Sequence, residues 1–420
     1  MIKDKAPAAP SPSRTSAAVT RTFGIELITP MYGGGAKAGI NDPTFPIRPT
    51  SIRGQLRFWW RATRGADAQI TTPEALFNKE KIIWGSVDEP SSTVIAVETQ
   101  PLNGKRDVRD DYNFPRYGGE AYALFSAKQN AHNLVKEGGR FTLKISFDRD
   151  FEDDISCALW AWVNFGGIGA RTRRGLGALY CHETAPDKAD IGSVRTWFQS
   201  KINKFGLLKG ADREWPTLWR DIIIGSHSYK DALQAWKDSV VPLKDFRQLP
   251  GFARGPITDG RPGRSFWSEP DTLRRSLETH CKKTGHVHVP SRSMPNGFPR
   301  AALGLPIVFQ FKGYPGDPEC VLHPAGKNRM ASPFILRPLK ARDGQCVPMS
   351  LLLDTPGLGF LGMNVLEIEG SGLTFGYAAV EDPGLAAYTN APMAGKSTGG
   401  SAIEAFCNYL INNRHFQRIP

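Results

Sequence analysis

The sequence contains no apolar run that approaches the roughly 18 residues needed to cross a bilayer. Its six cysteines are widely scattered, with no CxxC pair and no short disulfide framework, which indicates reduced thiols. The N-terminal region is rich in Ala, Pro and Ser and lacks the apolar segment of a secretory signal, so residues 1–20 are predicted to form a disordered tail. Together these absences predict a soluble, cytoplasmic protein without a membrane segment.

Acidic residues are absent from Arg48 to Gly65, although this segment contains five arginines. A helix here would place Ile52, Leu56 and Trp59 on one face and most of the arginines on a neighbouring face. Like charges on one face repel each other, and no Glu one turn away balances them. With a formal net charge of +12, the chain is predicted to bind a polyanion, RNA in particular. The alternative is a solvated helix flank whose arginine stems cover apolar surface. The arginines that share the face are Arg53, Arg57, Arg61 and Arg64.

A second basic segment runs from Gly166 to Gly177 and combines five glycines with Arg171, Arg173 and Arg174. Glycines let the backbone present its N–H groups, and arginines supply charge for phosphate contacts. The segment is not a P-loop, because no Gly-Lys-Ser/Thr closes it. It is not a dinucleotide fingerprint either, because Thr172 stands where the third glycine would fall. Its composition predicts a cradle for a phosphate backbone, and the alternative is a glycine-rich turn with solvated arginines.

Strand and helix patterns alternate along the N-terminal half in an order typical of a ferredoxin-like unit. The predicted elements are a strand at 22–29, a helix from 51, a strand at 140–147, a helix at 154–165 and a strand at 176–181. A more polar middle region carries predicted helices at 193–204 and 229–238. Strand patterns return at 304–311, 330–336 and 349–353, before a last helix at 400–412. The predicted parts are the tail (1–20), an N-terminal domain (21–184), a helical accessory region (185–298) and a C-terminal domain (299–420).

Three blocks of the sequence together resemble a known family. The first joins the opening strand and its glycine loop to the segment from Arg48 to Arg61, and the second is the loop from Gly166 to Gly177. A weaker third block consists of the segment from Arg329 to Pro333 together with Arg337, four residues after it. In combination they resemble the RAMP superfamily of CRISPR proteins, and within it the first subunits of Cmr-type (type III-B) effector complexes.

The resemblance implies an α+β fold of tandem ferredoxin-like (RRM-like) RAMP domains, which the polar middle region would interrupt as a helical insertion. It implies a non-catalytic RNA-binding subunit in antiviral defence, without a cofactor or membrane contact. Its partners would be the 3′ region of the crRNA, the target RNA and other Cmr/RAMP subunits. The stacking aromatics of RNP motifs are not evident. The residues predicted to bind RNA are Lys37, Arg48, Arg53, Arg57, Arg61, Arg64, Gly167, Gly169, Arg171, Thr172, Arg173, Arg174, Arg329 and Arg337.

A catalytic role is the main alternative. A metal-independent endoribonuclease of the RAMP superfamily, which processes CRISPR transcripts, would need a positioned histidine, and His182 follows the strand after the glycine loop. Cys281, His286 and His288 lack a fourth zinc ligand nearby, and residues 395–398 resemble the end of a P-loop without its first glycine. We therefore expect neither a metal site nor a nucleotide site. A basic scaffold that contacts mainly protein or membrane is a third interpretation.

Overall fold

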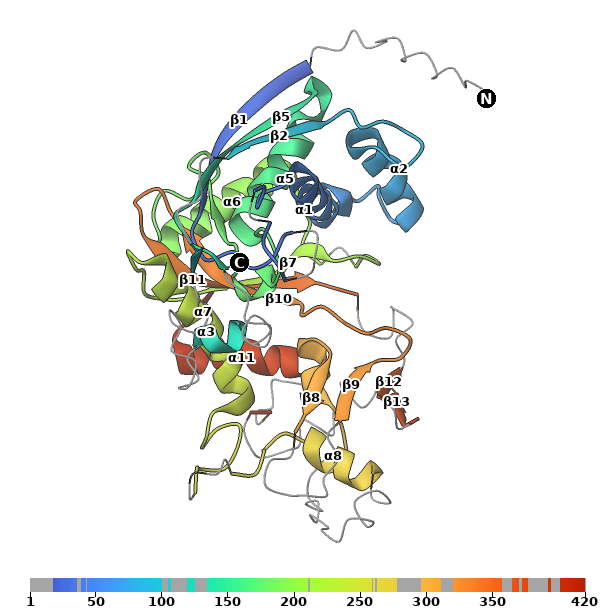
Figure 1. Ribbon diagram of the computed structural model, residues 1–420, viewed down its shortest axis with the longest axis vertical. Coiled ribbons are helices and arrows are strands. Elements are labelled where there is room, and N and C mark those ends of the chain that lie inside the picture. Colours follow the sequence, from blue (N-terminus) through green and yellow to red (C-terminus); the bar gives the residue numbers. More distant parts are fainter. Residues whose placement is uncertain are drawn as a thin grey trace.

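The computed structural model describes residues 18–35, 39–42, 44–99, 105–106, 119–124, 134–210, 212–258, 260, 263–277, 296–310, 320–356, 365–369, 372–376, 392–393 and 401–419. They form a mixed α+β fold with three four-stranded antiparallel sheets and one two-stranded pair. Figure 1 shows the main body as alternating layers, from top to bottom a sheet, helices, a second sheet and further helices. In this part of the chain, no helix combines the length and apolarity required to span a membrane.

The first sheet has the strand order β2-β5-β1-β6. Its strands are β1 (Ala18–Leu27), β2 (Val94–Thr99), β5 (Arg140–Asp148) and β6 (Leu179–Tyr180). The helix that follows β1 is α1 (Pro49–Ala62), and the helix that follows β5 is α5 (Glu152–Phe165). Smaller elements are η1 (Arg64–Ala66), α2 (Pro73–Trp84), β3 (Lys105–Arg106), α3 (Gly119–Ala123), β4 (Leu134–Val135), η3 (Arg149–Phe151) and η4 (Thr172–Arg174). The two strands β3 and β4 form the separate pair.

Local sequence explains the best-defined elements of this half. Along β5 every second side chain is buried, from Phe141 to Phe147, because strand side chains alternate between the two faces of a sheet. Helix α5 begins with three acidic residues, which favour the positive end of its dipole. Ten of the eleven residues that follow are buried, including Trp160 and Trp162, because α5 packs against both sheets. The apolar circumference of α5 thus reflects burial on both sides.

The second sheet has the order β10-β11-β7-β14. Ile222 and Ile224 of β7 join the core shared with α1 and α5, whereas Ile223 joins the core with α7 and α11. The sheet is therefore covered by helices on both faces. Its elements are β7 (Thr217–Ile224), α7 (Ala232–Gln248), β10 (Phe334–Lys340), β11 (Cys346–Asp354), α11 (Ala402–Arg414) and β14 (Gln417–Ile419). The helix α6 (Ile191–Phe205) links the two halves and packs in the shared core.

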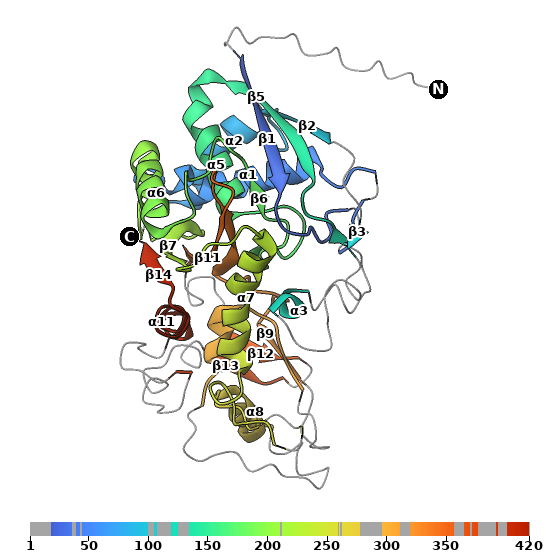
Figure 2. The same cartoon turned by 90° about the vertical axis from the view of Figure 1, so that its left-hand side faces the viewer.

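A third sheet forms a lobe beside the lower part of α7 and above α8, as Figure 2 shows. Its order is β13-β12-β9-β8, and it shares a small core with α8 and η6. The elements are α8 (Glu269–Ser276), η6 (Pro299–Leu303), β8 (Ile307–Phe309), β9 (Cys320–Pro324), β12 (Val365–Ile368) and β13 (Thr374–Gly376). Most of this lobe lies in sequence between α7 and β10, so it is an insertion into the second half.

Several predicted elements differ from the observed ones. The strand predicted at 176–181 is only Leu179–Tyr180, because Gly175 and Gly177 have φ values of 75° and 65° that no extended strand contains. The strand predicted at 330–336 begins at Phe334, and the helix predicted at 229–238 continues to Gln248. The middle region is not only helical, because it contributes β7 to the second sheet.

Candidate nucleic-acid interface

The arginine face of α1 has counter-charge that the helix itself does not supply. Arg57 Nε and Arg61 Nη1 both donate to Glu80 Oε1 on α2, at 2.6 and 2.8 Å. Glu80 is only 3% exposed, and both arginines are half-buried. The sequence-based inference that these charges are unbalanced is therefore wrong, and their repulsion does not by itself require a polyanion.

The two other arginines of this face also contact the protein. Arg53 donates to Trp84 O, Ser91 Oγ and Thr93 O, so it joins α1 to the connection between α2 and β2. Arg64 Nη1 donates to Phe205 O at 2.8 Å, at the end of α6. These contacts favour a structural role for much of the face.

Arg48 lies apart from that group, at the end of α1 where two loops meet. Tyr32, in the loop after β1, forms an isolated bridge with Ala170 in the glycine loop. Arg48 Nη2 donates to Gly35 O at 3.2 Å in the first of these loops. The tertiary structure therefore places Arg48 against the loop after β1, which bridges to the glycine loop, and directs the later arginines of α1 elsewhere. Lys37 lies outside the described residues.

The glycines of the loop at 166–177 are required by close packing. A Cβ atom on Gly175 would lie 2.5 Å from Trp236 Cδ1 and 2.7 Å from Leu336 O, both in the second half. A Cβ on Gly167 would lie 2.8 Å from Gly177 O. Gly169 has a φ of 84°. The loop thus packs tightly between the two halves, and glycine is needed where a Cβ atom would overlap with neighbouring atoms.

Replacing Gly175 by Ala should destabilise the fold by about 2 to 3 kcal/mol, because a left-handed backbone and an overpacked contact each cost about 1 kcal/mol or more. Gly326→Ala is a matched control, since Gly326 has a similar φ of 71° and no atom within 4 Å of the added Cβ. The midpoint of urea unfolding measures both. Equal losses of stability in the two variants would show that the close contacts around Gly175 contribute nothing to the effect.

The arginines of the loop lie at the junction of the two halves. Arg173 Nη1 donates to Ser332 O, and Arg174 Nη1 donates to Phe334 O at 3.3 Å. Burial lowers the pKa of each guanidinium to about 10, and for Arg174 the nearby Arg247 and Arg171 act in the same direction. Both arginines remain charged at neutral pH in a place that disfavours charge.

Arg247 and Tyr122 complete this basic cluster, and sequence reasoning missed both. Arg247 Nη1, at the end of α7, donates to Tyr122 Oη on α3 at 2.8 Å. Burial acts to raise the pKa of Tyr122, but Arg247, Arg174 and Arg171 together lower it. In the part of the chain that the structure describes, no carboxylate lies within 4.0 Å of the guanidinium nitrogens of Arg173, Arg174 or Arg247. No local motif marks residues 122 and 247, since only tertiary structure brings them to the loop.

Arg337 and Arg329 are in opposite environments. Arg337 is 0% exposed and donates to the carbonyl oxygens of Val163, Gly166 and Leu179. A side chain enclosed in this way cannot reach an external RNA without unfolding its surroundings, so its predicted RNA contact is corrected to a structural role. Arg329 is exposed in the connection between β9 and β10.

Comparison with known proteins shows a family resemblance over the N-terminal part of the chain. Residues 24–180 match the RAMP superfamily. Over this part the sequence is that of a RAMP domain, and the chain resembles the Cmr1 subunit. The chain is 27% identical to the CRISPR system Cmr subunit Cmr1-2 of Pyrococcus furiosus over 179 residues, 37% of this chain and 92% of that one. It is also 27% identical to Cmr1-1 of the same organism, over 44% of this chain and about half, 52%, of the relative.

Solved structures show the same fold. The crystal structure of apo Cmr1 from Pyrococcus furiosus aligns with a TM-score of 0.50 at 15% identity, over 96% of this chain and 98% of that chain. A chain in the cryo-EM structure of a type III-B Cmr-β complex bound to cognate target RNA aligns with a TM-score of 0.50 at 12% identity, over 80% and 94%. At these identities the likeness extends to the fold.

The described residues do not assemble the alternative catalytic, metal or nucleotide sites. His182 is exposed just after β6, with Nδ1 at 3.3 Å from Tyr180 Oη. The proposed zinc residues Cys281, His286 and His288 and the segment 395–398 lie outside the described residues. Among the residues described, no group of three metal-ligating side chains occurs.

Proposed function

We propose that this protein is a non-catalytic RNA-binding subunit of a type III-B CRISPR (Cmr) effector complex in antiviral defence. It contacts the 3′ region of the crRNA and the target RNA, beside other Cmr/RAMP subunits. The observation that carries the proposal is the cluster of Arg173, Arg174 and Arg247, which has no carboxylate partner among the described residues. The likeness to proteins named as Cmr subunits supports it.

We further propose that each half is a ferredoxin-like RAMP domain. The first half runs β1-α1-β2-β5-α5-β6 with the sheet order β2-β5-β1-β6. The second runs β7-α7-β10-β11-α11-β14 with the order β10-β11-β7-β14. In both halves the strands, numbered within the half, therefore lie side by side in the order second, third, first, fourth. This division assigns β7 and α7 to the C-terminal domain and leaves the third-sheet lobe as an insertion made of two segments, one between α7 and β10 and one between β11 and α11.

The proposed RNA surface follows the junction between the two domains. Its central contacts come from the glycine loop and from Arg247, and Arg48 and the exposed Arg329 extend it. Arg53, Arg57, Arg61 and Arg64 contribute through the exposed parts of their guanidinium groups, while Gly167 and Gly169 shape the loop. The loop contacts are Arg171, Thr172, Arg173 and Arg174.

Binding of a phosphate group would offset the energetic cost of this arginine cluster. A buried guanidinium without a carboxylate loses solvation and repels its neighbours, and a phosphodiester would offset both costs. Arginine also binds phosphate oxygens through two parallel hydrogen bonds. Single-stranded RNA is commonly held in basic grooves of this kind.

Replacing Arg174 and Arg247 by Ala should weaken binding of single-stranded RNA by about 10-fold or more. The dependence of log K on log salt should become shallower by about 0.7 for each phosphate contact that is lost. Fluorescence anisotropy across a salt series measures both quantities. Arg195→Ala, which removes an exposed arginine on α6, is the matched control. An unchanged slope in the double variant, with the fold intact, would refute the proposed surface.

The same purified protein separates binding from catalysis. We expect crRNA-repeat RNA to remain intact when it is incubated with the protein in EDTA. Site-specific cleavage that is lost on replacing His182 by Ala would instead favour the metal-independent endoribonuclease.

A further inference from the structure

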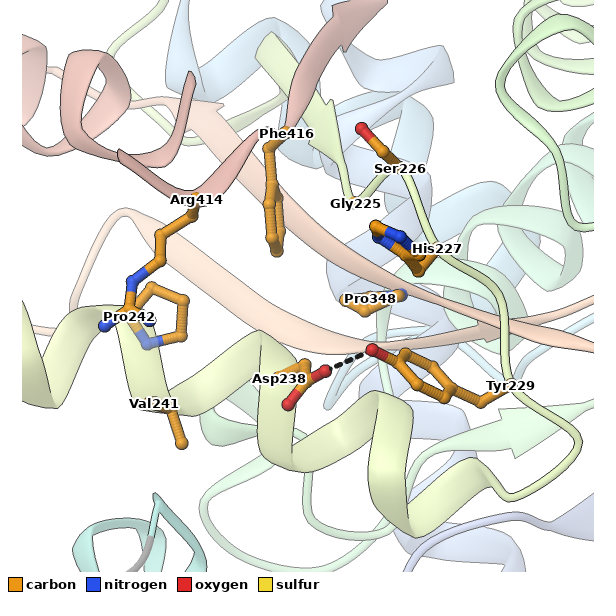
Figure 3. Close-up of a pocket in the computed structure, with 10 residues that line it drawn as sticks. All are labelled: Gly225, Ser226, His227, Tyr229, Asp238, Val241, Pro242, Pro348, Arg414 and Phe416. Atoms are coloured by element: carbon orange, nitrogen blue, oxygen red, sulfur yellow. Dashed lines mark hydrogen bonds between the residues drawn. The ribbon is translucent and has the colours of Figure 1, made fainter. Parts of the chain in front are cut away.

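A cavity of about 170 Å³ opens at the end of β7 (Figure 3). Its floor is formed by buried residues, among them Gly225, Pro348 and Phe416. Its mouth is formed by the exposed residues Ser226 and His227. The cavity is well below the roughly 300 to 1,000 Å³ of sites for drug-sized ligands, so it suits one flat ring system.

The cavity occupies the same topological place in the second half as the glycine loop does in the first. In the first half, the connection after β1 meets the connection between α5 and β6 through the bridge of Tyr32 with Ala170. In the second half, the connection after β7 meets the connection between α11 and β14, where Ser226 Oγ donates to His415 O. Two halves with the same strand order thus present equivalent loop pairs.

The side chains around the cavity are polar but largely neutralised. Tyr229 Oη donates to Asp238 Oδ2 at 2.5 Å, and this hydrogen bond raises the pKa of Tyr229 to about 12. The Arg414 guanidinium is paired with Asp245. The site therefore offers rings and hydrogen-bonding groups without a strong excess of positive charge, which suits an uncharged heterocycle better than a phosphate.

Positive charge lies along one edge of the cavity instead. Val241 of α7 lines the cavity. Lys237 lies four residues before it and Lys244 three residues after it, so the three side chains share one face of the helix, and Lys244 Nζ also lies 3.8 Å from Asp245 Oδ1. A backbone that passes the cavity along this edge would place its phosphates near these lysines.

We propose that the cavity is a second RNA subsite that receives one unpaired nucleobase. The base stacks against His227 and Phe416, which both line the cavity in Figure 3, and its flanking phosphates lie along Lys237 and Lys244. Stacking of extruded bases on aromatic side chains is a general mode of single-strand recognition. This subsite rests on the proposed RNA binding, and it adds a contact that depends on bases rather than on charge.

Two variants of the full-length protein test the subsite. Val241→Phe fills the cavity, and His227→Ala removes an exposed ring without disturbing the core. Each should weaken binding of oligouridine by about 10-fold, because stacking contributes about 1 to 3 kcal/mol per base, while the salt slope stays at the wild-type value. The two variants should bind an abasic oligomer of the same length as tightly as the wild-type protein does. Ser228→Ala, in the same connection but outside the cavity lining, should bind as the wild type does.

The outcomes distinguish this subsite from the proposed function. If Arg174→Ala weakens RNA binding while Val241→Phe and His227→Ala bind as the wild type does, the subsite is refuted and the proposed function stands. If the wild-type protein does not bind oligouridine, both fail. If Val241→Phe impairs only association with other complex subunits, a protein side chain occupies the cavity and the subsite is again refuted.

Discussion

Replacing Arg337 by Met should destabilise the protein by about 5 kcal/mol, measured as the free energy of unfolding in urea. The guanidinium is fully buried and holds the carbonyl oxygens of Val163, Gly166 and Leu179, so its loss leaves three buried acceptors unsatisfied at about 1 to 3 kcal/mol each. Two of these carbonyls lie at the C-terminal end of α5, where a cation also favours the helix dipole. Burial lowers the pKa of Arg337 to about 9, and the side chain remains charged at neutral pH.

Arg342→Met is the matched control for Arg337. Arg342 also connects the two halves, through His182 O and Asp187 Oδ1, but it is exposed. We expect a loss below about 1 kcal/mol, as for other exposed ion pairs. Similar losses of stability in the two variants would contradict the view that burial makes the hydrogen bonds of Arg337 costly to lose.

Replacing Arg57 and Arg61 together by Met should destabilise the protein by about 3 kcal/mol. The methionines keep most of the apolar stems, but Glu80 is left as a buried carboxylate without a counter-charge, and removing the partner of a buried ion costs about 3 to 5 kcal/mol. We take the lower value because both arginines are about one-third exposed. Thermal and urea unfolding should show the loss.

Adding Glu80→Gln to this double variant should restore part of the lost stability, because the buried charge is then absent. If the triple variant is no more stable than the double variant, the ion pairs with Glu80 are not the cause. Comparing the double and triple variants also helps to interpret RNA binding. If the triple variant recovers RNA binding that the double variant has lost, the loss was caused by reduced folding and not by a missing phosphate contact.

Elements whose signal lies within a few consecutive residues were predictable. The alternation in β5 and the helical spacing in α5, α6 and α11 appear in the sequence, and the structure contains each of these elements close to its predicted position. β7 was missed because its assignment depends on pairing with β11 and β14, which are far away in sequence. The sequence pattern predicts a strand at the end of the glycine loop, because apolar residues alone do not reveal left-handed backbone.

The candidate site was only partly predictable for the same reason. Charge and glycine content identified the loop at 166–177, and the structure places Arg173 and Arg174 at the junction of the halves. The sequence could not distinguish Arg337, which is enclosed by backbone carbonyls, from arginines that can meet a ligand. Nor could it place Arg247 and Tyr122 beside the loop.

By itself, the sequence determined that the chain is basic, mixed α+β and related in pattern to the RAMP superfamily, because composition, periodicity and short motifs are properties of neighbouring residues. Only the tertiary structure decided which arginines are neutralised. Glu80 lies 23 residues from Arg57, and the carbonyls that hold Arg337 lie more than 150 residues away from it. Electrostatic pairing depends on distance in space, and the fold alone sets that distance.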